Sequence, residues 1–259
     1  MPLMPGAQDV TTATEKGALP AVRLSVGGGD FMHFSGNGRR VHWSIGPTLY
    51  SAATEGVYGD KYKAPATGMD LSQTVRAAKP TGSVALTGAR VVTMRGADGG
   101  IIEDGVILIQ GDRIAAVGPR GSVTVPAGTP TVDVAGKTIV PGFIDAHAHG
   151  SQGVDGMTPQ QNWSTMANLA LGTTTIHDPS NRASEIFAAA EMQQAGLILA
   201  PRIFSTGEII YGAKAAGVFA DIGKYDDALA HVRRLKAQGA MSVKNYNQPR
   251  REQRQMVVA

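Results

Sequence analysis

The chain contains no cysteine among its 259 residues. Disulfide frameworks, thiolate metal sites, iron–sulfur clusters and cysteine nucleophiles are therefore excluded. Charged residues are scarce at 17%, and the formal net charge is only +3. The one basic cluster, formed by Arg250, Arg251 and Arg254, is interpreted as a solvated helix face, so no nucleic-acid partner is expected. Apolar residues still make up 42%, which is too many for a disordered chain.

Long apolar runs are absent as well. No stretch reaches the roughly 18 apolar residues that cross a bilayer, so no membrane partner is expected. Residues 1–16 contain no basic stretch followed by an apolar core, and we expect no signal peptide in this chain. The cellular location stays unknown, because the lack of cysteine does not fix a compartment.

The first segment has the pattern of a β-meander. Residues 40–44 have the period-2 alternation of a half-buried strand, and together with the runs 31–34 and 48–51 they predict the meander. Residues 35–38 (SGNG) between the first two runs are typical of a tight turn. Residues 52–79 are polar and weakly patterned, which predicts a loop or linker.

The pattern from residue 83 to residue 140 is also β. Residues 84–94, 106–110 and 113–117 are β-rich runs separated by glycine-containing turns, and Gly111-Asp112 predicts a tight hairpin. Several short strands with frequent turns indicate a small sandwich-like sheet.

Beyond residue 140, strands and helices alternate. This alternation predicts parallel strands with helical crossovers, either in an open doubly wound sheet or in a (β/α)₈ barrel. The predicted strands are 137–147, 173–177, 202–205 and 242–246, and the predicted helices are 158–171, 184–195, 225–237 and 251–258.

The strongest chemical signal is the pair His147 and His149 in the run FIDAHAHG. Two residues apart on a strand, both imidazoles are expected to point to the same side. They follow the carboxyl end of a predicted strand, which is where α/β folds place their active sites. Neutral imidazoles are suitable ligands for zinc or a similar cation. The alternative is two unrelated histidines at the start of a loop.

A long stretch of the chain resembles the amidohydrolase superfamily of metal-dependent hydrolases, in its imidazolonepropionase- and prolidase-like branch. The resemblance covers about residues 83–259 and rests on 87–93 (TGARVVT), 111–118 (GDRIAAVG) and 132–145 (VDVAGKTIVPGFID), which leads into the two histidines. It implies a small β-sandwich at 82–138 and a metal-dependent hydrolase barrel from 139 onward.

The resemblance also implies a ligand set. His147 and His149 would bind metal, and Lys244 would carry a carbamate, derived from carbon dioxide, that bridges two divalent ions, zinc by expectation. From the residues alone, Lys244 has two other interpretations: a surface lysine near a strand end, or a Schiff-base lysine as in barrel aldolases.

Other polar residues near the expected strand ends are candidates for contacts with substrate or with the metal ligands. Asp145 is either a support for the histidines or a strand-end cap. His177, oriented by Asp178, is either a substrate contact or a buried structural histidine. Tyr211, Lys214 and Tyr246 follow strands and would either face a pocket or be ordinary loop residues.

Residues 31–43 (FMHFSGNGRRVHW) resemble one blade of a TolB-type β-propeller, with only one copy visible. Residues 245–251 (NYNQPRR) resemble the stretch after the lysine in bacterial proteins that fuse such a propeller to an amidohydrolase. The resemblance implies that residues 1–81 are the remnant of a propeller plus a linker. Full-length relatives of this kind are often exported and otherwise cytoplasmic.

The expected fold class is therefore α/β: a remnant propeller blade at 1–81, a β-sandwich at 82–138, and an incomplete (β/α)₈ barrel of four units at 139–259. These last 121 residues are about half of the roughly 250 that such a barrel occupies. The family's further histidines and its aspartate base have no counterpart here, so we expect a truncated fragment that is inactive alone.

The leading interpretation is a metal-dependent amidohydrolase that hydrolyses C–N bonds of small amide or peptide-like substrates. A catalytically dead binding or propeller-associated module is the alternative from another class, and a Schiff-base lyase using Lys244 is a third. Oligomerisation stays open.

Overall fold

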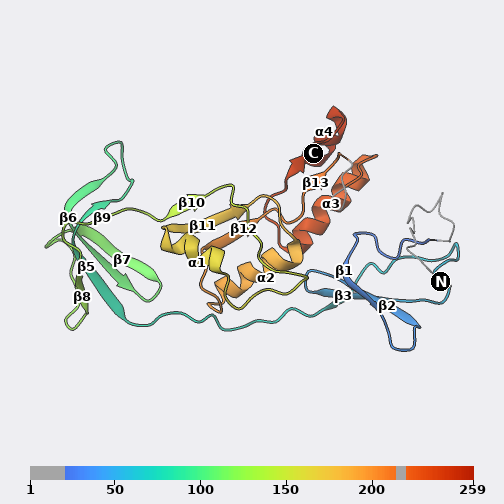
Figure 1. Ribbon diagram of the computed structural model, residues 1–259, viewed down its shortest axis with the longest axis horizontal. Coiled ribbons are helices and arrows are strands. Elements are labelled where there is room, and N and C mark those ends of the chain that lie inside the picture. Colours follow the sequence, from blue (N-terminus) through green and yellow to red (C-terminus); the bar gives the residue numbers. More distant parts are fainter. Residues whose placement is uncertain (1–20, 214–219) are drawn as a thin grey trace. The chain divides into compact units, whose positions relative to one another are not determined.

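The computed structural model describes residues 21–213 and 220–259 (Figure 1). It divides into two compact units. Unit 1 joins the N-terminal segment through Thr74 to Pro179–Phe187 and Ser205–Ala259, and unit 2 joins Val75–Asp178 to Ala188–Phe204. In the described part of the chain, no helix is both long and apolar enough to cross a membrane.

Unit 1 begins with the predicted β-meander. The strands β1 (Asp30–Phe34), β2 (Arg40–Ile45), β3 (Thr48–Ala53) and β4 (Met69–Asp70) pair antiparallel in that order (Figure 1). Alternation along β2 buries Val41 and Trp43 with Ala52 of β3. The turn before β2 is held by the Ser35 hydroxyl, which donates to Asn37 Oδ1 at 2.8 Å. The short strand β4 lies within the segment expected to be a loop.

The rest of unit 1 is built around helix α3 (Tyr225–Gln238), with β13 (Ile210–Tyr211), β14 (Asn245–Tyr246) and α4 (Arg251–Val258). Its core contains Ile210, Leu235 and Val257. Helix α3 begins where Asp227 Oδ2 accepts the backbone N–H groups of Gly223 and Lys224, and it ends at Gly239, whose φ of 117° is left-handed. These signals explain why the sequence placed α3 almost correctly.

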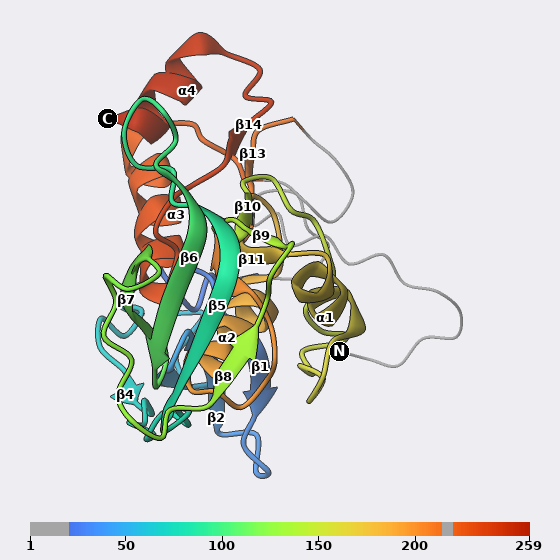
Figure 2. The same ribbon diagram turned by 90° about the vertical axis from the view of Figure 1, so that its left-hand side faces the viewer.

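Unit 2 contains one five-stranded sheet in the segment expected to be a small sandwich. Its strands are β5 (Ser83–Val92), β6 (Ile101–Gln110), β7 (Arg113–Pro119), β8 (Thr131–Asp133) and β9 (Thr138–Ile139). The long antiparallel pair β5–β6 forms its centre (Figure 2), and the short strands β8 and β9 both pair parallel to β5. The pairing of Gln110 with Arg113 confirms the hairpin turn at Gly111-Asp112.

A second sheet has the order β10 (Phe143–Asp145), β11 (Thr173–Asp178) and β12 (Arg202–Ser205), with β10 and β11 parallel. Helix α1 (Trp163–Ala170) connects β10 to β11, and α2 (Ala183–Gln194) connects β11 to β12. The strand–helix alternation predicted from the sequence is therefore present from β10 to β12. A mixed α/β fold with parallel pairing is what the structure shows.

Two predicted strands differ from the structure. The run 137–147 is not one strand but is interrupted between β9 and β10, because β9 pairs with β5 whereas β10 pairs with β11. The run 242–246 is reduced to β14, which pairs parallel with β13 through Ile210 and Asn245. The prediction missed β13 because two residues are too few to show a period.

Gly142 allows β10 to lie close against β11. A Cβ at this position would collide with the Thr174 side chain and would approach Thr174 Cβ to 2.7 Å. We expect Gly142→Ala to destabilise the chain by about 1–3 kcal/mol, the usual cost of overpacking. Urea unfolding provides the measurement. Gly36→Ala is the control, since a Cβ there meets nothing within 4 Å, and equal midpoints for the two variants would contradict the prediction.

His231 on α3 is partly buried. Burial lowers the pKa of its imidazole from the ordinary 6.5, with Arg234 adding to the effect and the Asp221 carbonyl opposing it. As the pH falls, the imidazole of the unfolded chain therefore takes up a proton at a higher pH than the imidazole of the folded chain does. We expect stability to fall as the pH drops from 7.5 through 6.5, and His231→Gln to remove part of this fall. Unfolding midpoints at pH 7.5 and 5.5 test it; an unchanged pH dependence in the variant would contradict it.

Candidate metal centre

The two histidines of the predicted metal motif lie in the turn directly after β10, not on the strand. The strand ends at Asp145, and Asp145 Oδ1 accepts the backbone N–H of His147 at 3.0 Å. This side-chain acceptor stabilises a turn in place of a further strand pair. The two side chains were predicted to share one side of a strand, and that reason is wrong because neither histidine lies on the strand.

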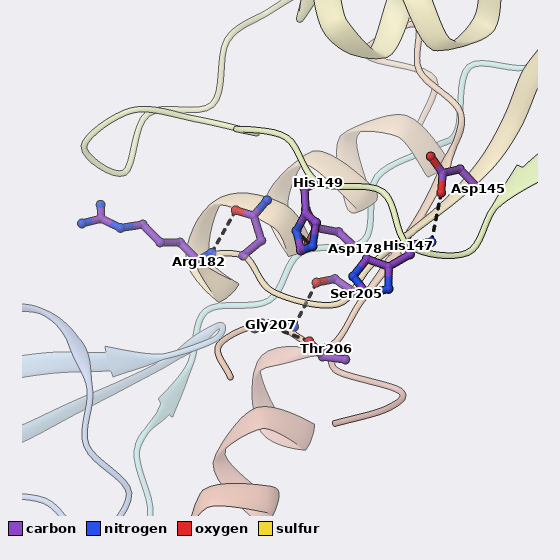
Figure 3. A network of polar contacts seen from close by, with 9 residues as sticks. Asp145, His147, His149, Asp178, Arg182, Ser205, Thr206 and Gly207 are labelled. Atoms are coloured by element: carbon purple, nitrogen blue, oxygen red, sulfur yellow. Dashed lines mark hydrogen bonds and ion pairs between the residues drawn. The ribbon is translucent and has the colours of Figure 1, made fainter. Parts of the chain in front are cut away.

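The structure nevertheless brings the two imidazoles together. The ring centroids of His147 and His149 are 5.0 Å apart, and their planes meet at 69° (Figure 3). The backbone N–H of Ala148, between them, donates to the carbonyl of His177 at 3.0 Å. The turn is thereby attached to the end of β11, so both rings are placed by the pairing of β10 with β11.

A buried carboxylate lies beside His149, the second histidine of the pair. The Asp178 side chain is 1% exposed, and its Oδ1 is 3.6 Å from Nδ1 of His149, whose side chain is 51% exposed (Figure 3). This distance is within ion-pair range and long for a hydrogen bond. Asp178 was expected to orient His177, but the structure places its carboxylate next to His149. His177 contacts the turn through its backbone carbonyl.

Lys244 and Tyr246 belong to unit 1, whereas the histidines belong to unit 2. Lys244 directly precedes β14, and its carbonyl accepts the N–H of Ile210 at 2.9 Å. Its Nζ lies 4.8 Å from the centroid of the Tyr246 ring, which in turn contacts Tyr211 at a centroid distance of 5.5 Å. The Lys244 side chain therefore lies against the ring pair of Tyr246 and Tyr211, two residues that the sequence analysis named only because both follow predicted strands. Lys214 lies outside the described residues.

The donor set fits part of a metal site. Two imidazoles with nitrogens about 2.0–2.1 Å from one ion, at angles of about 90–110°, have centroids roughly 4.5–5.2 Å apart. The observed 5.0 Å lies in this range. Among the described residues, no group of three or more His, Asp or Glu side chains is arranged to hold a metal ion. The pair therefore accounts for two ligands.

The loop that follows His149 forms a hollow that the sequence did not indicate. Its volume is about 560 Å³, and Val154, Met157 and Trp163 supply apolar walls. A two-residue bridge between Val154 and Met157 closes the loop, and Asn162 begins α1 by accepting the N–H of Ser164. Met157 within the glycine-rich loop and Trp163 at the start of α1 were the signal available for this hollow.

Comparison with known proteins places these features in context. No family model matches the chain. Imidazolonepropionase of Ruegeria sp. (strain TM1040) is 46% identical over 67 residues, which are 25% of this chain and 16% of that protein. A 5-methylthioadenosine/S-adenosylhomocysteine deaminase of Pelotomaculum thermopropionicum is 43% identical over 70 residues, 26% of this chain and 16% of that protein. The matches thus span about a sixth of these relatives.

Two solved structures resemble the fold. A Bifidobacterium longum protein assigned as a prolidase has a TM-score of 0.54 at 24% identity, over 63% of this chain and 40% of its own. A bottromycin amidohydrolase has a TM-score of 0.50 at 19% identity, over 66% of this chain and 35% of its own. Together with the curated relatives, these partial matches support the amidohydrolase superfamily.

The Asp178 carboxylate gives a testable expectation for the His149 ring. Because Nδ1 faces a buried carboxylate, we expect the metal-free ring to favour the tautomer protonated at Nδ1. Asp178→Asn should shift the ring toward a mixture of both tautomers, read from ¹⁵N–¹H spectra of the imidazole nitrogens. The control is Asp145→Asn, which keeps an acceptor for the His147 N–H. Identical His149 spectra in the wild-type chain and Asp178→Asn would reject this role.

Proposed function

We propose that this chain is the metal-ligand-bearing part of a metal-dependent amidohydrolase, a hydrolase of C–N bonds. The observation that carries the proposal is the adjacency of His147 and His149 after β10, at a centroid separation suited to one shared ion. The partial matches to an imidazolonepropionase and to an amidohydrolase structure support the same class. Small amide or peptide-like molecules are the proposed substrates.

His147 and His149 are proposed to supply two ligands of a zinc centre. Asp178 would orient the His149 ring from behind, as carboxylates commonly do for metal-binding histidines. Asp145 would hold the turn through the His147 backbone. A bound divalent ion supplies a Lewis acid that polarises a carbonyl and lowers the pKa of a bound water.

Lys244 is proposed to carry a carbamate, the role that the sequence resemblance implies for it. Its uncharged amine would attack carbon dioxide, forming an N–C bond and releasing one proton to leave an anionic carbamate. This step uses the uncharged amine, so the ammonium proton is lost before it. The position of Lys244 directly before β14 supports the assignment, and the Tyr246 ring next to its Nζ is a candidate substrate contact.

We also propose the segment division given by the sequence resemblance: a propeller remnant and linker at 1–81, a β-sandwich at 82–138, and the first half of a barrel at 139–259. The parallel pairing of β10 with β11 supports the barrel assignment, and the antiparallel β1–β3 meander supports the blade. Residues 1–20 of the first segment lie outside the described part.

No residue of this chain is assigned as the catalytic base, so we propose that the chain alone binds metal without turnover. The apolar hollow lined by Val154, Met157 and Trp163 follows His149 directly in the sequence and is proposed to receive an apolar group of the substrate. Sustained hydrolysis of dipeptides or cyclic amides by the purified chain, supplied with zinc and bicarbonate, would overturn the proposed inactivity.

The metal assignment is tested by titrating the purified chain with zinc while following the ring nitrogens of each histidine by NMR. We expect the resonances of His147 and His149 to move together, and His147→Ala or His149→Ala to weaken zinc binding at this site by about tenfold or more. His231→Gln is the matched control. Resonances of both rings that do not respond to zinc would reject the proposed centre.

The carbamate is tested separately with ¹³C-labelled bicarbonate. A labelled carbamate carbon signal is expected in the zinc-loaded chain and not in Lys244→Ala. A signal of equal size in Lys244→Ala would exclude Lys244 as its carrier while leaving the histidine assignment intact.

A further inference from the structure

A second pair of imidazoles lies on the β1–β2 hairpin of unit 1. His33 and His42 are direct cross-strand partners, so their side chains leave the sheet on the same face. The neighbouring residues Val41 and Trp43 are buried on the opposite face. His33 is exposed and His42 is half-buried, and both are therefore open to solvent ions.

The two rings are already close to each other. Their centroids are 5.1 Å apart, with the planes at 24°. Two imidazoles that share one ion have centroids roughly 4.5–5.2 Å apart, given nitrogen–metal distances of about 2.0–2.1 Å, so the pair is already at a suitable distance. The rings are stacked, however, so the His42 ring has to turn out of the stack to direct a nitrogen toward an ion held by His33.

A β-bulge fixes the tautomer of His33. The register shifts between Asp30 and His33, and Phe31 within this bulge has a φ of 55°, an uncommon value for a residue with a side chain. The Phe31 carbonyl lies 2.9 Å from Nδ1 of His33. A carbonyl only accepts, so Nδ1 donates and Nε2 keeps its lone pair. Metal-binding histidines typically make this bond from their other nitrogen to a backbone carbonyl.

We propose that His33 and His42 form a second metal-binding site, for a late first-row divalent ion with Cu²⁺ preferred. Two imidazoles supply two nitrogen ligands, and water would fill the remaining positions, since no group of three His, Asp or Glu ligands occurs in the described chain. Sites of few nitrogen ligands bind Cu²⁺ more tightly than Zn²⁺ or Ni²⁺, according to the general affinity order of these ions.

One nearby charge limits the affinity of this site. Arg40 precedes His42 by two residues on the same face of β2, and its Nε donates to Ser51 Oγ at 2.8 Å. Ser51 is the cross-strand partner of His42 on β3, so this bond holds the guanidinium near the two imidazoles. Its positive charge repels a cation and should weaken binding by a salt-dependent amount.

The alternative is a stack of two neutral rings that only packs. Such aromatic pairs contribute about 0.5–1.5 kcal/mol without any ion. The packing alternative and the metal site make different predictions for metal titrations, because packing alone gives no dependence of copper affinity on His33 or His42.

The test titrates Cu²⁺ into the full chain carrying His147→Ala and His149→Ala, which leaves the β1–β2 pair intact. We expect one bound ion with electron paramagnetic resonance couplings from two imidazole nitrogens. Adding His33→Ala or His42→Ala should lower copper affinity by about tenfold or more and leave one nitrogen coupling. Near-ultraviolet circular dichroism of the buried Trp43 checks that the hairpin stays folded.

Two further variants sharpen the result. Ser44→Ala changes the next residue on the same face of β2 and should leave copper affinity unchanged. Arg40→Gln should tighten binding by about twofold to tenfold at low salt, and this gain does not depend on removing a histidine. Copper affinity that is the same with and without His33 and His42 would overturn the proposal, whatever the outcome at His147 and His149.

Discussion

The hydrogen bond from the Ala148 N–H to the His177 carbonyl is the contact on which the candidate centre depends. It joins the turn after β10 to the end of β11, so the parallel pairing of these strands also fixes where both imidazoles lie. Parallel strands place their carboxyl ends at one edge, and side chains that follow them meet there. Packing of Gly142 against Thr174 therefore also helps to fix where the two imidazoles lie.

A buried carboxylate is costly unless it has polar partners, because burial removes its hydration. Asp178 makes such a contact with His149 and also with other groups around it. A carboxylate in this position orients the ring and favours the proton on the nitrogen that faces it, which leaves the other nitrogen as a ligand. The contact of Asp178 with His149 would orient the ring for a metal ion. It is weak evidence of stabilisation, because the cost of burying charge can exceed the gain from pairing it.

The sequence predicts the elements best where local signals are strong. Helix α3 follows from its apolar spacing and from Gly239 after its end, and the β1–β3 meander follows from the alternation of residues 40–44 and the turn before them. The sequence gives no such signal for β13, whose two residues gain their structure from pairing with β14. The adjacency of His147 and His149 was predicted, but on a strand, whereas the Asp145 side chain accepts the His147 N–H and ends the strand before them. The metal role of both residues stays a prediction.

The two imidazole pairs differ in ring orientation and in the charge beside them. Their centroid separations are 5.0 Å and 5.1 Å, but the planes meet at 69° in the His147–His149 pair and at 24° in the stacked His33–His42 pair. His149 has the buried carboxylate of Asp178 at its back, and a negative charge there favours a cation on the ring. His42 has the guanidinium of Arg40 on its face of the sheet, which opposes a cation. A weakly bound ion should therefore occupy the His147–His149 pair first, and the hairpin pair should fill only with an ion of high intrinsic affinity for nitrogen.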